Sequence, residues 1–186
     1  MEKNLEEQSK NRRYRIIVFG PESTGKTTLA KQLAAHYKAT YVPEYARIYA
    51  EEKQRKGEQL TAEDVIPIAK GQLRLECQAA GNSMLICDTD ILETLTYARI
   101  YYPEFKSETL QKYVAKNKAD FYFLTYIDTP WESDGIRDLP HQREEAFLQF
   151  QQTLKTYNQP YVLLKGDKET RFKTAITEID KLLEVH

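Results

Sequence analysis

The stretch from Gly20 to Thr27 constrains this chain more than any other part of its sequence. Its residues read GPESTGKT, which fits the pattern G-x-x-x-x-G-K-[ST]; an apolar run precedes it and a helical pattern begins directly behind it. In that strand–loop–helix context, backbone N–H groups and the helix N-terminus bind the phosphates of a nucleotide. Lys26 reaches the β- and γ-phosphates, and the hydroxyl of Thr27 binds Mg²⁺. The sequence therefore predicts a nucleoside triphosphate site that uses Mg²⁺.

Apolar runs of strand length alternate with longer amphipathic stretches along the rest of the chain. Strands are predicted at Tyr14–Phe19, Thr40–Val42, 84–87, 121–127 and Tyr161–Leu164. Helices are predicted at Lys26–Tyr37, 44–56, 61–80, 89–101, 107–116, 139–157 and Lys168–Glu184. Because several strands are apolar without alternation, both faces of their sheet must be covered. We therefore expect an α/β fold: one P-loop NTPase domain over 14–186, with a five-stranded parallel sheet and helices on both faces.

Length and charge limit what such a domain binds. The chain has 186 residues, the size of one domain, and 27 Lys and Arg against 28 Asp and Glu give a formal net charge of −1. This balance argues against binding nucleic acid or an anionic membrane through an overall field. No apolar run reaches the ~20 residues of a membrane span. Residues 1–13 are charged and lack the apolar core of a signal peptide, so we expect a flexible arm and a cytoplasmic protein, in an oligomeric state left open.

A second sequence that fits a nucleotide-binding motif lies in a structural context that does not suit the motif. Residues 117–120 read NKAD, which fits the N-K-x-D pattern that reads guanine in GTPases. In GTPases this motif should follow a strand, whereas here it ends a predicted helix and precedes a strand, and no D-x-x-G sequence accompanies it. We interpret the match as a coincidence and expect ATP as the nucleotide.

Acidic residues end two of the predicted strands, at the edge where open α/β sheets bind ligands. Asp88 follows the apolar run 84–87 and suits the position that holds Mg²⁺ or its water ligands. Asp90 either accepts a hydrogen bond from a substrate sugar or caps the following helix. Glu44 either takes the proton of an attacking hydroxyl or is a first-turn residue paired with Arg47.

The alternation of strands and helices breaks at about 128–145, where proline, glycine and charged residues mix. A long irregular segment inside a compact domain is usually a functional loop, so we expect a lid. Arg137 and Arg143 either stabilise charge on the transferred phosphoryl group or pair with nearby acids on the surface. Trp131, the single tryptophan, either stacks on a flat heteroaromatic or cationic ring or belongs to the core.

Two further residues follow the last predicted strand. Gly166 and Arg171 lie on the same carboxyl edge of the sheet as the phosphate loop. They either flank the adenine of ATP or form an ordinary turn with a surface arginine, and the sequence favours neither.

Five segments together resemble the ribosylnicotinamide kinase domain of NadR-type proteins, over residues 14 to about 180. They are GPESTGKTT at 20–28, PEYAR at 43–47, DTD at 88–90, PWESDGIR at 130–137, and GD with a later Arg at 166–171. The resemblance implies a P-loop kinase fold and transfer of phosphate from Mg-ATP to the 5′-hydroxyl of nicotinamide riboside, a small-molecule substrate, in NAD salvage.

The resemblance also assigns roles to individual residues. It implies that Lys26, Glu44, Asp88, Arg137 and Arg143 take part in catalysis, with Thr27 and Asp88 at the metal. ATP would contact Gly20, Pro21, Glu22, Ser23, Thr24, Gly25, Lys26, Thr27, Thr28, Gly166 and Arg171. The nucleoside would contact Glu44, Tyr45, Arg47, Asp90, Trp131 and Asp134.

Family members often carry a DNA-binding domain and a nucleotidyltransferase as well. Few residues precede the first predicted strand, and the three histidines are isolated rather than arranged as H-x-G-H, so we expect a stand-alone kinase. Two other functions stay open. One is a kinase for another nucleoside or small metabolite, because pockets that differ by a few contacts are not told apart by sequence. The other is a nucleotide-dependent binding module that transfers no phosphate.

Overall fold

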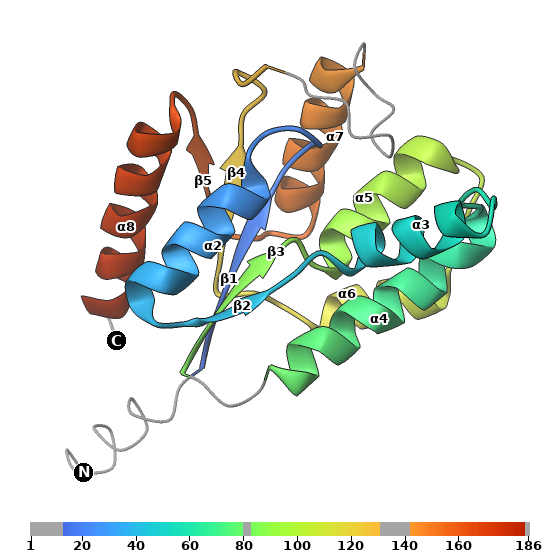
Figure 1. Ribbon diagram of the computed structural model, residues 1–186, viewed down its shortest axis with the longest axis horizontal. Coiled ribbons are helices and arrows are strands. Elements are labelled where there is room, and N and C mark those ends of the chain that lie inside the picture. The colour runs from blue at the N-terminus through green and yellow to red at the C-terminus, as the bar shows by residue number, and fades with distance from the viewer. Residues whose placement is uncertain (1–12, 80–82, 131–141, 185–186) are drawn as a thin grey trace.

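A parallel sheet of five strands organises the computed structural model, which describes residues 13–79, 83–130 and 142–184 (Figure 1). The strands are β1 (Tyr14–Phe19), β2 (Thr40–Val42), β3 (Met84–Asp88), β4 (Phe121–Thr125) and β5 (Tyr161–Leu164). Their order across the sheet is β2-β3-β1-β4-β5, and all four pairings are parallel. Since β1 lies at the centre, the loop that leaves its carboxyl end also lies at the centre of that edge.

Seven α-helices and one short 3₁₀ helix connect the strands in the described residues. They are α2 (Lys26–Tyr37), α3 (Tyr45–Arg55), η1 (Ala62–Asp64), α4 (Val65–Gln78), α5 (Ile91–Tyr101), α6 (Glu108–Lys116), α7 (Arg143–Thr156) and α8 (Lys168–Glu184). The predicted α/β fold, with five parallel strands in a P-loop arrangement, is confirmed.

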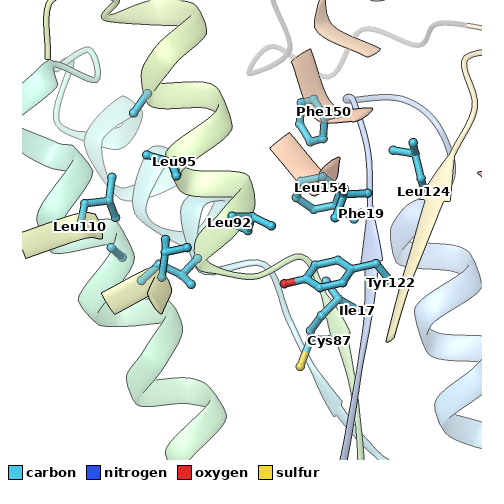
Figure 2. Packing of buried hydrophobic residues seen from close by; sticks show 14 of the residues in the cluster. Ile17, Phe19, Cys87, Leu92, Leu95, Leu110, Tyr122, Leu124, Phe150 and Leu154 are labelled. Carbon is cyan, nitrogen blue, oxygen red and sulfur yellow. The ribbon is translucent and has the colours of Figure 1, made fainter. Parts of the chain in front are cut away.

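Helices cover both faces of the sheet because successive side chains of a strand point to opposite sides. Ile16 and Val18 of β1 pack in one cluster with residues of α2 and α8. Ile17 and Phe19 of the same strand pack in a second cluster with residues of α4, α5, α6 and α7. Figure 1 shows α2 and α8 on one side of the sheet and α3 to α6 on the other. Figure 2 shows the second cluster, in which Phe19 lies beside Leu154 and Tyr122.

Element ends differ from the sequence prediction where local hydrogen bonds decide them. The segment predicted as one helix over 61–80 begins with η1, and the predicted cap is present: the Thr61 backbone N–H donates to the Asp64 carboxylate at 2.8 Å. The helix predicted from residue 89 begins at Ile91, because Asp90 accepts the Leu92 N–H at 2.9 Å as its N-cap. The strand predicted over 121–127 ends at Thr125.

The NKAD sequence lies at the amino edge of the sheet, opposite the phosphate loop. Asn117 follows the last residue of α6, and its carbonyl oxygen accepts a hydrogen bond from Arg15, near the start of β1, at 3.0 Å. Asp120 accepts the Arg15 backbone N–H at 2.8 Å. The motif therefore connects the starts of β1 and β4 through hydrogen bonds to Arg15. This place, away from the phosphate loop, is consistent with its interpretation as a coincidence.

Candidate active site

The loop between β1 and α2 has the backbone that its glycines and small residues permit. Gly25 has φ 81° and Ser23 has φ 57°, both left-handed conformations. A Cβ on Gly20 would lie 2.4 Å from Oγ1 of Thr125, so only glycine allows the loop to pass the end of β4. The Thr24 hydroxyl donates to the Pro21 carbonyl at 2.7 Å and shares a second hydrogen bond with Thr125, also at 2.7 Å. These contacts fix the loop before any ligand arrives.

Lys26 folds back over this loop. Its Nζ donates to the carbonyl oxygens of Gly20 at 2.8 Å and Pro21 at 2.9 Å, and lies 3.5 Å from a carboxylate oxygen of Glu93. The side chain is only 8% exposed. Its ammonium group is thus held at the loop. When a nucleotide binds, Lys26 can replace these hydrogen bonds to neutral carbonyls with stronger ones to a charged phosphate.

Thr27 and Asp88 meet at the start of α2 and the end of β3. The Thr27 hydroxyl donates to Oδ2 of Asp88 at 2.6 Å, and the Tyr41 hydroxyl donates to the same oxygen at 3.3 Å. Burial, with the Asp88 charge next, raises the pKa of Tyr41. Oδ1 of Asp88 is buried and has no hydrogen-bond partner in the described part of the chain.

This pair fits a Mg²⁺ ion. Mg²⁺ takes oxygen ligands and usually keeps several waters, held by one or two protein groups and the substrate phosphates. A hydroxyl beside a carboxylate with one unused oxygen is that kind of donor set. Among the described residues no three His, Cys, Asp or Glu side chains are grouped to hold a metal, so phosphate and water would have to complete the coordination.

A cavity of 1080 Å³ opens beside the phosphate loop. The loop, α3, α4, α5 and the segment 57–61 contribute to its wall. The site residues predicted from sequence that line it are Glu22, Ser23, Thr24, Gly25, Lys26, Thr27, Thr28, Glu44 and Arg47. The structure therefore brings the acid and arginine of the PEYAR segment to the same space as the phosphate loop.

Arg143, the first residue of α7, reaches the phosphate loop. Its guanidinium donates to the carbonyl oxygens of Thr129 at 2.8 Å and Ser23 at 3.4 Å, and its Nε is buried without a partner in the described residues. Burial lowers the pKa of Arg143, while the charges of Glu22 and Asp128 oppose this shift. One end of the expected lid is thereby tied to the phosphate loop, and the role of Arg143 toward phosphate stays a prediction. The other lid residues of the prediction, Trp131, Asp134 and Arg137, lie outside the described residues.

Asp90 does not reach the cavity. Its Oδ1 caps α5, while Oδ2 accepts the Tyr122 hydroxyl at 2.6 Å and the Arg15 guanidinium at 3.3 Å. In Figure 2 the Tyr122 hydroxyl points away from Leu124 and toward the chain that enters α5. The carboxylate is 0% exposed and both of its oxygens are engaged inside the protein. This geometry favours the helix-capping alternative over contact with a substrate sugar.

Tyr45 is also turned away from the cavity. A Cβ on Gly71 would lie 1.9 Å from the Tyr45 ring, so the ring packs directly over α4. Its backbone N–H donates to Oε1 of Gln72 at 2.9 Å. Tyr45 therefore joins α3 to α4. It is not among the described residues that line the cavity, where its side chain was expected to contact the substrate.

Arg171 and Gly166 hold loops together and do not line the cavity. The guanidinium of Arg171 donates to the carbonyls of Thr24 at 2.6 Å, Gly166 at 2.9 Å and Tyr126 at 3.0 Å, and pairs with Asp128. The Gly166 N–H donates to the same carboxylate at 2.6 Å. Arg171 is 4% exposed and is therefore not the surface arginine of one alternative, while its contact with adenine stays a prediction. It fixes the phosphate loop against the loop after β5.

Several lining residues were not found from sequence. Glu93, Tyr97 and Tyr101 all line the cavity from one face of α5. Their spacing of four residues places them on that face, and this periodicity after the DTD segment is the signal that could have found them. Other lining residues outside the prediction include Gln72, Thr89, Thr94, Tyr102 and Lys168.

Comparison with known proteins identifies the family of this chain. The model of the AAA domain family matches residues 15–171, most of the chain. The chain belongs to the AAA domain family. It is also homologous to the trifunctional NAD biosynthesis/regulator protein NadR, with 25% identity to that of Salmonella typhimurium over 174 residues and 28% to that of Escherichia coli over 128 residues. These matches cover 90% and 67% of this chain but only 42% and 31% of the two relatives.

Solved structures share the fold. A NadR protein in complex with NR superposes with a TM-score of 0.79 at 24% identity, covering 91% of this chain and 50% of that one. A deoxyadenosine kinase from M. mycoides superposes with a TM-score of 0.64 at 14% identity, covering 90% of this chain and all of the other. The fold is therefore that of P-loop kinases. A separate property is that no described helix is long and apolar enough to cross a membrane.

Proposed function

We propose that this protein transfers the γ-phosphoryl group of ATP to the 5′-hydroxyl of nicotinamide riboside and so makes nicotinamide mononucleotide. The observation that carries the proposal is the cavity, whose wall joins the phosphate loop to Glu44 and to the aromatic face of α5. Such a wall has a place for a triphosphate and, next to it, room for a nucleoside. Homology to NadR, and the NR bound in a solved NadR structure, support this choice of nucleoside.

The proposed reaction is an in-line displacement. The 5′-oxygen of the riboside attacks the γ-phosphorus while the bond to the β–γ bridging oxygen breaks, and ADP leaves with that electron pair. The hydroxyl proton goes to a carboxylate, for which the sequence left Glu44 and Asp88 open. Glu44 lines the cavity whereas Asp88 is bonded to Thr27 beneath it, so we assign the proton to Glu44.

Charge stabilisation supplies most of the remaining catalysis. Lys26 would leave the Gly20 and Pro21 carbonyls for the β- and γ-phosphates. Arg143, already at the Ser23 carbonyl, would face the transferred group, and Arg137 is assigned to the same task. Thr27 and Asp88 would hold Mg²⁺, which when bound neutralises phosphate charge. In this proposal the protein is a small-molecule enzyme of the cytoplasm.

An assay of ADP formation over a panel of nucleosides tests the proposal. Nicotinamide riboside should stimulate ADP release far above the rate without nucleoside, and the product should be the 5′-monophosphate. Deoxyadenosine and thymidylate belong in the panel because solved structures that share this fold include a deoxyadenosine kinase and a thymidylate kinase. A rate with nicotinamide riboside equal to the background would overturn the choice of substrate.

A further inference from the structure

Glu93 is a buried carboxyl group that the fold leaves without a hydrogen bond. It lies in the first turn of α5 with its side chain 4% exposed. Neither Oε1 nor Oε2 has a hydrogen-bond partner among the described residues. Burial raises the pKa of Glu93 well above its ordinary value; the Lys26 charge opposes this, and the charges of Glu44, Asp88 and Asp90 add to it. A buried acceptor without a donor is costly, so native proteins rarely keep one without a use for it.

The place of Glu93 indicates what that use is. The residue lines the cavity together with Glu44, and its Oε1 lies 3.5 Å from Nζ of Lys26, the group that reaches the β- and γ-phosphates in a phosphate loop. Glu93 is therefore next to the point where a phosphoryl acceptor must meet the nucleotide. When Lys26 turns to the phosphates, Glu93 loses the ammonium group that lies 3.5 Å from its Oε1.

The neighbouring residues cannot supply the missing donor from their described positions. Asp90, one turn earlier, is fully engaged by the α5 cap, Tyr122 and Arg15. Glu44 is itself an acceptor when ionised. The donor that completes Glu93 therefore has to enter through the cavity.

We propose that Glu93 is the substrate-binding residue that accepts a hydrogen bond from a ribose hydroxyl of the nucleoside. A hydroxyl that hydrogen-bonds to this buried carboxyl group would satisfy oxygen atoms that have no hydrogen-bond partner among the described residues. The ring hydroxyls of a riboside lie close to the 5′-oxygen, which must approach the phosphate beside Lys26. This assignment rests on the proposed function, and it moves the sugar contact from Asp90 to Glu93.

Kinetics of Glu93→Gln and Glu93→Ala against wild type test the assignment. The nucleoside KM should rise about 10-fold in Glu93→Ala, because removing one partner of a buried hydrogen bond leaves the other unpaired, and less in Glu93→Gln, whose carbonyl oxygen still accepts; the KM for ATP should stay within about twofold. The 2′-deoxy and 3′-deoxy forms of the same nucleoside give the decisive comparison. For the form that lacks the bonded hydroxyl, wild type and variants should have nearly the same KM. Glu108→Gln, on an exposed residue of α6, is the matched control and should leave all constants unchanged.

The outcomes separate this assignment from the proposed reaction. An active wild type whose nucleoside KM does not change in either Glu93 variant, or changes equally for the ribose and both deoxy forms, overturns the assignment alone. Calorimetric titration of nucleosides in the presence of a non-hydrolysable ATP analogue covers the other case. A wild type that binds a ribonucleoside through Glu93 but does not phosphorylate nicotinamide riboside overturns the proposed substrate and keeps the assignment. No nucleoside binding at all overturns both.

Discussion

Replacing Asp90 with alanine tests whether this carboxylate serves the fold or the substrate. Its side chain is fully buried and makes three contacts: the Leu92 N–H at 2.9 Å, the Tyr122 hydroxyl at 2.6 Å and the Arg15 guanidinium at 3.3 Å. Loss of a helix cap costs about 1 kcal/mol. A buried hydroxyl left without a partner costs about 1–3 kcal/mol.

Losing the ion pair between Asp90 and Arg15 should lower the free energy of unfolding by less than the loss of a buried pair usually does. Removing one partner of a buried pair costs about 3–5 kcal/mol when the other charge is left alone. Here Arg15 keeps Glu76, whose carboxylate accepts from its Nε at 2.7 Å, so this loss is partly offset. We therefore expect Asp90→Ala to lower the free energy of unfolding by about 3 kcal/mol, less than the sum of the separate terms because the contacts are coupled.

Urea unfolding followed by circular dichroism measures this loss, with the urea dependence of the free energy expected to stay the same. Asp90→Asn is the matched control: its single carbonyl oxygen keeps the Leu92 cap, while its NH2 group replaces the oxygen that accepts from Tyr122 and Arg15, so it should recover about 1 kcal/mol, the contribution of the cap. The folded Asp90→Ala protein should keep the nucleoside KM of wild type. A loss below about 1 kcal/mol together with a tenfold higher KM would refute the reasoning and return the sugar contact to Asp90.

Three further predictions concern the loop and its neighbours. Lys26→Ala should lower kcat by a factor of about 10³ because the charge on the phosphates is lost, while the circular dichroism spectrum is unchanged; a rate near wild type would contradict the phosphate-loop assignment. Glu93→Gln should melt at a higher temperature than wild type at about pH 8, because a carboxyl whose pKa is raised in the folded state contributes stability below its unfolded pKa and loses it as pH rises through the folded pKa. The advantage should shrink toward about pH 5, and a difference independent of pH would argue against a buried carboxyl that titrates. Arg171→Lys should cost about 1.5–3 kcal/mol in urea unfolding, since one ammonium group cannot reach the carbonyls of Thr24, Gly166 and Tyr126 together, and an unchanged midpoint would contradict this.

The fold and the phosphate end of the site were predictable because short-range signals decide them. The pattern at 20–27 needs only its own glycines and the strand and helix on either side. The cap of Thr61 by Asp64 and the apolar strands are equally local. Each of these features is decided within a few residues, and the structure has each of them.

The nucleoside end was harder to predict because it depends on which side of a helix faces the cavity. Asp90 and Glu93 are both acids at the start of α5; the residue pattern left Asp90 open between a sugar contact and a helix cap, and the family resemblance placed it at the nucleoside. Arg15 and Tyr122 come from distant parts of the chain and donate hydrogen bonds to Asp90. These bonds keep the Asp90 side chain inside the protein and away from the cavity. Arg171 is a similar case, since its partners lie in three separate loops.

The wall of the cavity is divided in a way that bears on how such an enzyme changes its substrate. The phosphate side comes from one continuous segment, 22–28, whose neighbour Gly20 tolerates no side chain beside Thr125. Another part of the wall comes from the helices α3, α4 and α5 and from the segment 57–61. In the proposed kinase, point substitutions on those helices would change which nucleoside binds and leave the phosphate loop intact, so a search for a new acceptor would vary Arg47, Gln72 and Tyr97 before the loop.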